Sequence, residues 1–170
     1  ERLLRAAQGG PVEGVVARID GRSTRLRARR GVVLAAGGFS RNEEWLRIFA
    51  PSQAQGVRYG GKGSMGDGIR MARALGAGLR DMAFIKGTFG YHPNARTQQG
   101  RDWTKLPVYR GAIAVNRHAK RYVDESKSYK LLGDAVLGQP DAIAYQIFDQ
   151  GIMDTRADGV PPFDFGSALR

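Results

Sequence analysis

Cysteine is absent from this chain of 170 residues, and histidine occurs only twice, as His92 and His118. The lack of thiols excludes a disulfide framework, a zinc–thiolate site, an iron–sulfur cluster and a catalytic cysteine. Two histidines argue against an all-histidine metal site, so no metal is predicted. No stretch approaches the roughly 18 consecutive apolar residues of a transmembrane helix. The sequence therefore predicts no integral membrane segment.

The first residues, Glu1–Arg5, contain neither an initiator Met nor the apolar core of a signal peptide. Apolar residues make up 42% of the chain and charged residues 25%, which is ordinary for a globular domain and argues against disorder. The length fits one domain, or one domain with part of a second.

Positive charge is in excess, with 27 Lys and Arg against 16 Asp and Glu and a formal net charge of +11. Proteins that bind nucleic acids or acidic surfaces share this excess. However, 21 of these residues are Arg spread along the whole chain, with no combined aromatic and basic face. Only Arg22–Arg30 is dense, and as a strand it would place Arg25, Arg27 and Arg29 on one face. A solvated strand face is the favoured interpretation, and an acidic surface packed against it is the alternative.

Residues 12–34 predict a β-hairpin. The apolar, β-branched run VEGVVARI is followed by the turn pair Asp20-Gly21 and a second strand, STRLRARRGVVL. The continuation GVVLAAGGF, residues 31–39, is wholly apolar and contains two adjacent glycines. Such a run is typical of a strand buried on both faces of an α/β sheet.

Two helices are predicted next. Ser40 and Glu43 fit a capping box for a helix that Pro51 ends. A loop rich in glycine and glutamine covers residues 52–66. A second helix begins near Asp67, its expected N-cap, and loses its apolar pattern at a Gly-Ala-Gly sequence.

The remaining chain has the pattern of a compact α+β unit with several strands and one short helix. The expected strands are residues 83–89, 111–116, 120–125 and 142–149, and the helix covers about residues 128–137. The predicted apolar face of that helix comprises Leu131, Leu132, Ala135 and Val136.

Residues 61–66, GKGSMG, match the dinucleotide-binding pattern G-x-G-x-x-G letter for letter. The match fails in context, because that pattern follows directly on a hydrophobic strand and the preceding residues here are SQAQGVRY. What remains is a glycine-rich loop that leads into a helix. Its backbone N–H groups and Asp67 are candidates for ligand contact.

Several motifs together resemble one superfamily of flavoproteins. VVLAAGGF is followed by GSMGDGI, a lone His-Pro, GAIAVNRHAKRYVDES, a helix and AIAYQIFD. This order is similar to that of FAD-dependent oxidoreductases of the fumarate reductase and succinate dehydrogenase flavoprotein superfamily, nearer the 3-ketosteroid dehydrogenase branch. The resemblance covers about residues 10–150.

The resemblance implies a Rossmann-type FAD-binding domain interrupted by a capping domain that closes over the flavin. The chain is then an internal piece of a longer enzyme. Its fold class is predicted as α+β, a flavoprotein capping (catalytic) domain with a β-hairpin and strand stub of the FAD-binding domain. The implied parts are residues 1–40, the end of the first FAD-binding segment; residues 41–150, the capping and substrate domain; and residues 151–170, its exit segment.

The implied cofactor of the full-length protein is FAD. The isolated piece is not expected to retain it, because the family's own G-x-G-x-x-G and ribose-binding acid are expected before Glu1. Asp67, in GDG, matches an Asp that touches FAD in fumarate reductases, and Gly66 precedes it. Ala36, Gly37 and Gly38 match the glycine turn beside the cofactor. These five residues are the predicted cofactor contacts.

The proton relay of fumarate reductases is not matched. Tyr129, in ESKSYK, stands where that family has Arg, and ungapped counting back from Asn116 puts the relay Glu at Lys105, after Thr104. E-S-x-x-Y instead resembles the 3-ketosteroid dehydrogenases, in which a capping-domain Tyr takes part in proton abstraction. Tyr129 and His92, which matches a substrate-pocket His, are the predicted catalytic residues. Thr104 and Lys105 are predicted to line the substrate.

A free phenol has a pKa of about 10, so a Tyr that acts as a base needs neighbours that favour the phenolate. Lys127, Lys130 and Arg121 are the nearby charges in the sequence. The competing interpretation is that Tyr129 is a packing residue at the start of a helix.

The predicted function is hydride transfer between FAD N5 and a carbonyl-activated C–C bond of a 3-ketosteroid-like substrate. The alternative is a fumarate reductase-like enzyme for a small carboxylic acid, which Arg96 and Arg101 favour as carboxylate ligands. Expected partners are the small-molecule substrate and the remainder of the protein's own FAD-binding domain, with no nucleic acid. The expected location is the bacterial cytoplasm. Since the chain has no Cys, the redox chemistry belongs to the flavin.

Overall fold

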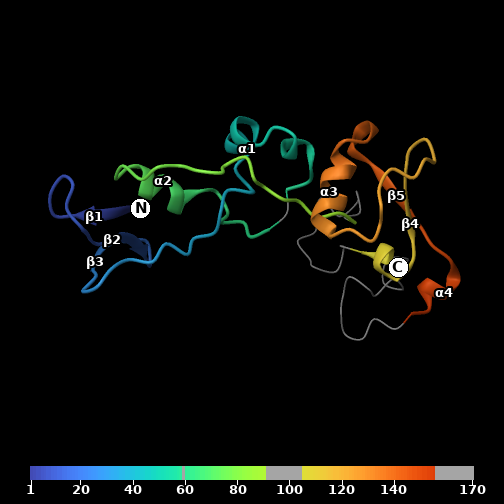
Figure 1. Cartoon of the computed structure of the whole chain (residues 1–170). Coiled ribbons are helices and arrows are strands. Elements are labelled where there is room, and N and C mark those ends of the chain that lie inside the picture. The colour runs from blue at the N-terminus through green and yellow to red at the C-terminus, as the bar shows by residue number, and fades with distance from the viewer. Residues whose placement is uncertain (59, 91–104, 156–170) are drawn as a thin grey trace. The chain divides into compact units, whose positions relative to one another are not determined.

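The computed structural model describes residues 1–58, 60–90 and 105–155, which fall into two compact units. Unit 1 comprises residues 1–49 and 58–83, and unit 2 comprises residues 50–57 and the chain from residue 84 onward. Both units contain helices and strands (Figure 1), which confirms the mixed helix-and-strand class. Among the described residues, no helix is long and apolar enough to cross a membrane.

Unit 1 contains an antiparallel sheet in the order β1-β2-β3. β2 (Val12–Ile19) and β3 (Arg22–Arg27) form the predicted hairpin. Asp20 and Gly21 have φ angles of 48° and 78°, as the predicted type I′ turn requires. β1 (Arg2–Arg5), which no sequence pattern predicts, pairs with the other edge of β2.

The arginines of β3 lie on an exposed strand. Arg25 and Arg27 are exposed, and Leu26 on the opposite face is itself 44% exposed. These exposures fit the interpretation of a solvated strand face.

The buried strand predicted at residues 31–39 is wrong for the described structure. No strand forms there, and Val33 is 89% exposed while Leu34 is 40% exposed. A strand needs a hydrogen-bonding neighbour, and none of the described strands pairs with this segment. The apolar pattern alone therefore does not make the strand.

Two helices complete unit 1, α1 (Glu43–Phe49) and α2 (Asp67–Arg73), close to their predicted positions. Phe39 packs edge-on against Trp45 and Phe49, with ring centroids 5.5 and 6.0 Å away. This cluster joins α1 to the segment before it. Unit 1 therefore extends past the predicted boundary at residue 40, and the assignment of segments to FAD-binding and capping domains stays a prediction.

Both helix caps differ from the predictions. Asn42, not Ser40, caps α1, because the helix begins at Glu43, two residues later than predicted, and the Asn42 Oδ1 accepts a hydrogen bond from the Trp45 N–H at 3.0 Å. Gly66, not Asp67, is the N-cap of α2, with a φ of 86°. Asp67 is the first residue of the helix itself.

Unit 2 is built on the antiparallel pair β4 (Ile113–Asn116) and β5 (Ala144–Ile147) and on α3 (Tyr129–Leu137), all within predicted segments. Two other predicted strands are wrong. Residues 83–89 form no strand, and residues 120–125 contribute a single bridge to β4. The shorter elements are the 3₁₀ turns Gln53–Gln55, Pro107–Arg110 and Pro140–Ala142 and helix α4 (Gln150–Met153).

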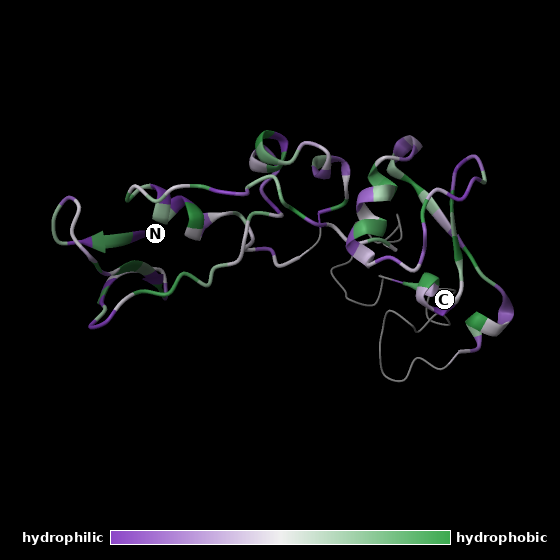
Figure 2. Ribbon diagram, in the orientation of Figure 1, coloured by the Kyte–Doolittle hydropathy of each residue, from purple (hydrophilic) through white to green (hydrophobic). Residues whose placement is uncertain are grey.

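The core of unit 2 gathers under α3 and β4, where Figure 2 shows apolar residues in green. Leu132 is fully buried, whereas Leu131, predicted for the same face, is 49% exposed. Gly133 is buried beside Leu132. A Cβ at this position would lie 3.3 Å from the Thr88 backbone, so the close approach favours glycine. The buried face of α3 therefore centres on Leu132 and Gly133 and excludes Leu131. The core residues are Phe89, Val108, Ala112, Ala114 and Leu132.

Candidate functional site

A cavity of about 260 Å³ lies in unit 1 between the glycine turn and α2. Ala36 and Gly37, two predicted cofactor contacts, line it from one segment, and Gly68 and Ile69 line it from the helix. Every lining residue is apolar or glycine. The complete lining is Leu34, Ala36, Gly37, Gly68, Ile69, Ala72, Ala77, Gly78 and Leu79.

The glycine turn is joined to the start of α2 by a backbone hydrogen bond. The Gly66 N–H donates to the Gly38 carbonyl at 2.9 Å. Gly37 and Gly66 both have left-handed φ angles, 75° and 86°, which favour glycine. A Cβ on Gly66 would also lie 2.7 Å from the ring of Trp45. This position therefore requires glycine for both reasons.

Asp67 lies on the surface next to this junction. Its side chain is 62% exposed, and its Oδ1 accepts an ion-pair contact from the Arg70 Nη2 at 2.8 Å. The structure thus brings together the two predicted segments, residues 36–38 and 66–67, within unit 1.

The described residues fit one part of a flavin nucleotide. A lining of glycine and apolar side chains suits a flat apolar group that approaches the backbone closely. Nothing lies within 4 Å of the position that a Cβ on Gly38 would take, so the described residues leave that backbone open to such an approach. Pockets that enclose a small ligand measure roughly 300–1,000 Å³, so this smaller cavity fits only a portion of FAD.

Tyr129, the predicted base, is the first residue of α3 in unit 2 and is 42% exposed. The Lys130 Nζ lies 6.0 Å from the centre of its ring. Nearby, the Tyr109 hydroxyl donates to the Lys127 carbonyl at 3.2 Å and so ties the preceding turn in place. Of the charges expected to favour the phenolate, Arg121 is already held by Glu125.

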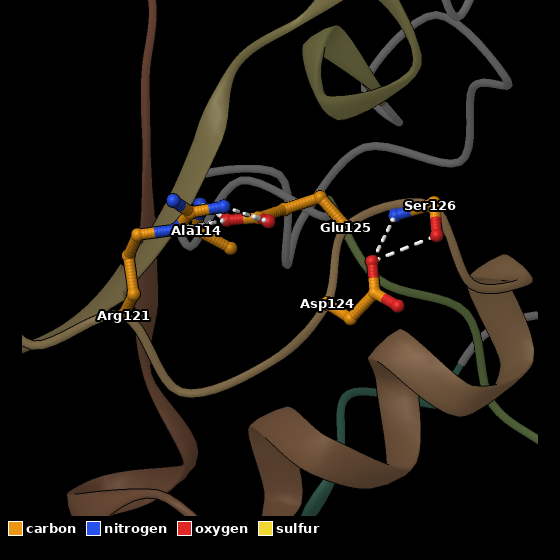
Figure 3. Close-up of polar contacts among 5 residues, drawn as sticks. All are labelled: Ala114, Arg121, Asp124, Glu125 and Ser126. Atoms are coloured by element: carbon orange, nitrogen blue, oxygen red, sulfur yellow. Dashed lines mark hydrogen bonds and ion pairs between the residues drawn. The ribbon is translucent and has the colours of Figure 1, made fainter.

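In unit 2, the carboxylate of Glu125 is held by several hydrogen bonds (Figure 3). Its carboxylate accepts two hydrogen bonds from Arg121, at 3.2 and 2.7 Å, and one from the buried Ala114 N–H at 2.8 Å. Arg121 and the backbone N–H groups lower the pKa of Glu125 to about 2, against the opposing effect of burial. The residue is 8% exposed, and its hydrogen bonds fix the loop after β4.

Two neighbours of Glu125 complete the local electrostatics. Burial, together with the Glu125 charge, raises the pKa of Tyr122 to about 12. The Tyr122 hydroxyl is buried and has no hydrogen-bond partner among the described residues. Asp124 accepts from the Ser126 N–H and hydroxyl at 3.0 and 2.7 Å, which lowers its pKa. A second cavity of about 450 Å³ lies beside these residues.

The Glu125 contacts predict an acid-sensitive fold. Because the folded pKa lies below the ordinary value of 4.5, the charged carboxylate stabilises the fold above pH 4.5, and this contribution is lost as the pH falls toward about 2. Glu125→Gln should lower the free energy of unfolding by about 1–2 kcal/mol at neutral pH. In this variant the free energy of unfolding should also decrease less as the pH falls from 4.5 toward about 2. Denaturant unfolding at several pH values checks this. Glu44→Gln, on the exposed side of α1, is the control and should keep the wild-type profile; an unchanged profile for Glu125→Gln would contradict the assignment.

Of the three other predicted site residues, the structure describes one, Lys105. Lys105 is half-buried. Its backbone N–H donates to the Gly90 carbonyl at 3.0 Å, and its carbonyl accepts from the Gln146 Nε2 at 3.1 Å. His92 and Thr104 lie outside the described residues. Within the described part of the chain, no group of three or more His, Cys, Asp or Glu could hold a metal ion.

Sequence reasoning missed two residues beside the glycine site, Arg41 and Asn42. Both bond to the glycine-rich loop of residues 60–66. Asn42 stands directly before the first helical residue, which is a favoured N-cap position, but the Ser40 capping-box pattern concealed it. Nothing in the sequence points to the role of Arg41.

Comparison with known proteins gives one family and several relatives. The model of the FAD binding domain family matches residues 1–159. Fumarate reductase (cytochrome) of Shewanella frigidimarina is 35% identical over 121 residues, covering 71% of this chain and 20% of the relative. The 4-oxocyclohexanecarboxylate 2-dehydrogenase of Sinomonas cyclohexanicum is 33% identical over an alignment of 195 positions including gaps, which covers 97% of this chain and 31% of the relative.

Among solved structures, the chain is similar to the 3-ketosteroid-Δ4-(5α)-dehydrogenase of Rhodococcus jostii RHA1, in complex with 4-androstene-3,17-dione. The two are 32% identical with a TM-score of 0.61, and the match covers 89% of this chain and 28% of that one. The chain thus spans about a fifth of the length of the fumarate reductase and under a third of the two dehydrogenases. These matches confirm the predicted superfamily.

Proposed function

Because the chain belongs to the FAD binding domain family, we propose that it is part of an FAD-dependent oxidoreductase that transfers hydride between FAD N5 and a C–C bond next to a carbonyl. The observation that carries this proposal is the glycine site of unit 1. Its predicted cofactor contacts, far apart in the sequence, meet through the Gly66–Gly38 hydrogen bond of 2.9 Å.

The two compact units support a revised assignment of the chain to the FAD-binding and capping domains. All five predicted cofactor contacts belong to unit 1, whereas Tyr129 and Lys105 belong to unit 2. We therefore assign unit 1 to the FAD-binding domain and unit 2 to the capping domain. This moves the main boundary proposed from the sequence from residue 40 to about residue 83, with residues 50–57 also assigned to unit 2.

In this assignment the backbone of Ala36–Gly38 and Gly66, with the Asp67 side chain, holds the cofactor. When bound, FAD supplies the hydride acceptor. In its phenolate form, Tyr129 would accept the proton from the carbon next to the substrate carbonyl, while the neighbouring carbon would lose hydride and the C=C bond would form. The phenol is half-exposed at the start of α3, and no described residue forms a hydrogen bond to its hydroxyl, so it is free to meet a substrate.

The relatives support a ring ketone as substrate. Two of them are named for such compounds, 4-oxocyclohexanecarboxylate and a 3-ketosteroid. A ketone beside the reacting bond acidifies the proton that a Tyr can remove. The predicted match of Tyr129 to the relay Arg and of Lys105 to the relay Glu of fumarate reductases supports the same substrate class.

A fumarate reductase-like activity is the second candidate, and the 35% identity to the Shewanella frigidimarina enzyme favours it. Rapid mixing of the full-length protein with each substrate distinguishes the two candidate activities. We expect 4-oxocyclohexanecarboxylate or a 3-ketosteroid with a saturated A ring to reduce its oxidised flavin, and fumarate to leave its reduced flavin unchanged. Rapid reoxidation by fumarate with no reduction by either ketone would establish the second candidate instead.

A further inference from the structure

The glycine-rich loop before α2 is held by the side chains of two residues far from it in sequence. The Arg41 guanidinium donates to the Gly60 carbonyl through Nε and Nη2, at 3.2 and 3.0 Å. The Asn42 Nδ2 donates to the Met65 carbonyl at 2.9 Å. The first and the sixth residue of the loop of residues 60–66 are thereby fixed to the segment before α1.

Two backbone hydrogen bonds also join the loop of residues 60–66 to residues 38–41. The Arg41 N–H donates to the Ser64 carbonyl at 2.9 Å, and the Gly66 N–H donates to the Gly38 carbonyl at 2.9 Å. Within the loop, the Ser64 N–H closes a turn on the Gly61 carbonyl at 3.0 Å. The loop therefore lies along residues 38–42 in one defined conformation.

Asn42 uses both ends of its amide. It is 9% exposed, its Oδ1 caps α1 by accepting from the Trp45 N–H, and its Nδ2 donates to Met65. A buried amide needs both kinds of partner. Of the residues that cap helices well, Asn alone carries its acceptor and its donor on two separate atoms, a carbonyl oxygen and an NH2 group. The same side chain therefore couples the start of α1 to the residue just before Gly66.

We propose that Arg41 and Asn42 are positioning residues for FAD binding, which hold the loop of residues 60–66 so that Gly66 and Asp67 meet the cofactor. The inference rests on the proposed function of unit 1 as the FAD site. Neither residue needs to touch FAD, because each acts through the loop. The hydrogen bonds from the Arg41 and Asn42 side chains to this loop are here called the clamp. A loop that is already ordered loses less conformational entropy on binding, so loss of the clamp weakens the affinity for FAD.

Asn42→Asp separates the two roles of the side chain. Asp caps a helix as well as Asn, so α1 stays capped, but the donor to Met65 is lost and a carboxylate oxygen faces that carbonyl. Arg41→Ala removes the contacts to Gly60 only. We expect each variant of the full-length apoprotein to raise the Kd for FAD about tenfold or more, as loss of a net hydrogen bond implies. The Tm of the apoprotein should change little in Arg41→Ala, whose guanidinium bonds are exposed, and should fall in Asn42→Asp, which buries an unpaired carboxylate. Flavin fluorescence titration and thermal unfolding measure these two quantities.

Arg47→Ala is the matched control. Arg47 lies on the exposed side of α1, is 71% exposed and pairs with Glu43 on the same helix, so its loss should leave the Kd for FAD unchanged. Rescue provides a further readout: Arg41→Lys, which can place one donor near Gly60, should recover part of the affinity lost in Arg41→Ala.

The outcomes are distinct. A wild-type protein that binds no FAD would overturn the proposed function rather than the clamp. Wild-type binding with Kd values within about twofold for both variants would overturn the clamp alone. A fall of Tm in Asn42→Asp with no change of Kd in Arg41→Ala would likewise assign Asn42 a structural role only and overturn it. If Asn42→Asp fails to fold, Arg41→Ala decides, since the Arg41 guanidinium bonds lie at the exposed surface.

Discussion

Replacement of Tyr129 by Phe in the full-length enzyme is expected to slow flavin reduction by a ring ketone about 10²–10⁴-fold, the range that general acid–base groups contribute. The reason is that Phe keeps the ring and its packing but removes the oxygen that takes the proton. The flavin content should stay at the wild-type level, because Tyr129 belongs to unit 2 and the predicted cofactor contacts belong to unit 1.

The stability should change little as well, since Tyr129 is 42% exposed and its hydroxyl has no hydrogen-bond partner within the described residues. Anaerobic stopped-flow reduction measures the rate, and the visible absorption spectrum measures the flavin. Tyr145→Phe on β5 is a matched control, because that residue is 54% exposed and outside the proposed site. Equal reduction rates for Tyr129→Phe and the wild type would leave Tyr129 as a packing residue.

The second large effect concerns Gly66. Gly66→Ala puts a Cβ 2.7 Å from the Trp45 ring and 3.2 Å from the Phe39 Cβ, at a φ of 86° that side chains rarely adopt. Trp45 cannot yield easily, because it packs edge-on against Phe39 and Phe49 with centroids 5.5 and 5.9 Å away. Together, backbone strain and overpacking should lower the free energy of unfolding by about 2–4 kcal/mol, and the full-length protein should lose FAD.

Gly63→Ala provides the control in the same loop. A Cβ at Gly63 meets nothing within 4 Å, and its φ is not left-handed. This variant should therefore stay within about 1 kcal/mol of the wild type, since Gly→Ala at a compatible position is neutral or slightly stabilising. Thermal unfolding and flavin content distinguish the two variants. Equal Tm and equal flavin content for Gly66→Ala and Gly63→Ala would contradict the described packing at Gly66.

Local patterns predicted the elements that depend on local interactions. The turn pair Asp20-Gly21 placed the hairpin, since left-handed φ angles are a property of those two residues. The apolar spacing likewise placed α3 at residues 129–137 and the strands β4 and β5.

The failures come from interactions between distant segments. The apolar run of residues 31–39 forms no strand because its pairing partner is not among the described strands. Leu131 lies outside the core because the face of α3 that packs on the chain near Thr88 presents Leu132 and Gly133. The clamp of Arg41 and Asn42 on a loop about twenty residues away has no signature in sequence spacing.

The candidate site divides in the same way. The resemblance placed the glycine contacts, and the structure brings those residues together in unit 1. The electrostatic role of Glu125 had no sequence signal, because Arg121 reaches it from a segment without regular structure. Among the predicted catalytic and substrate residues, the described chain includes Tyr129 and Lys105, and their roles stay proposals.

The central claim is that this chain supplies part of an FAD site, and the flavin content of the purified full-length protein tests it most directly. The visible absorption spectrum of the protein, with the cofactor released and identified as FAD, gives the number of flavins per polypeptide. The proposal predicts one FAD per polypeptide. A protein that carries no flavin as purified, and takes up none after incubation with FAD, would contradict it.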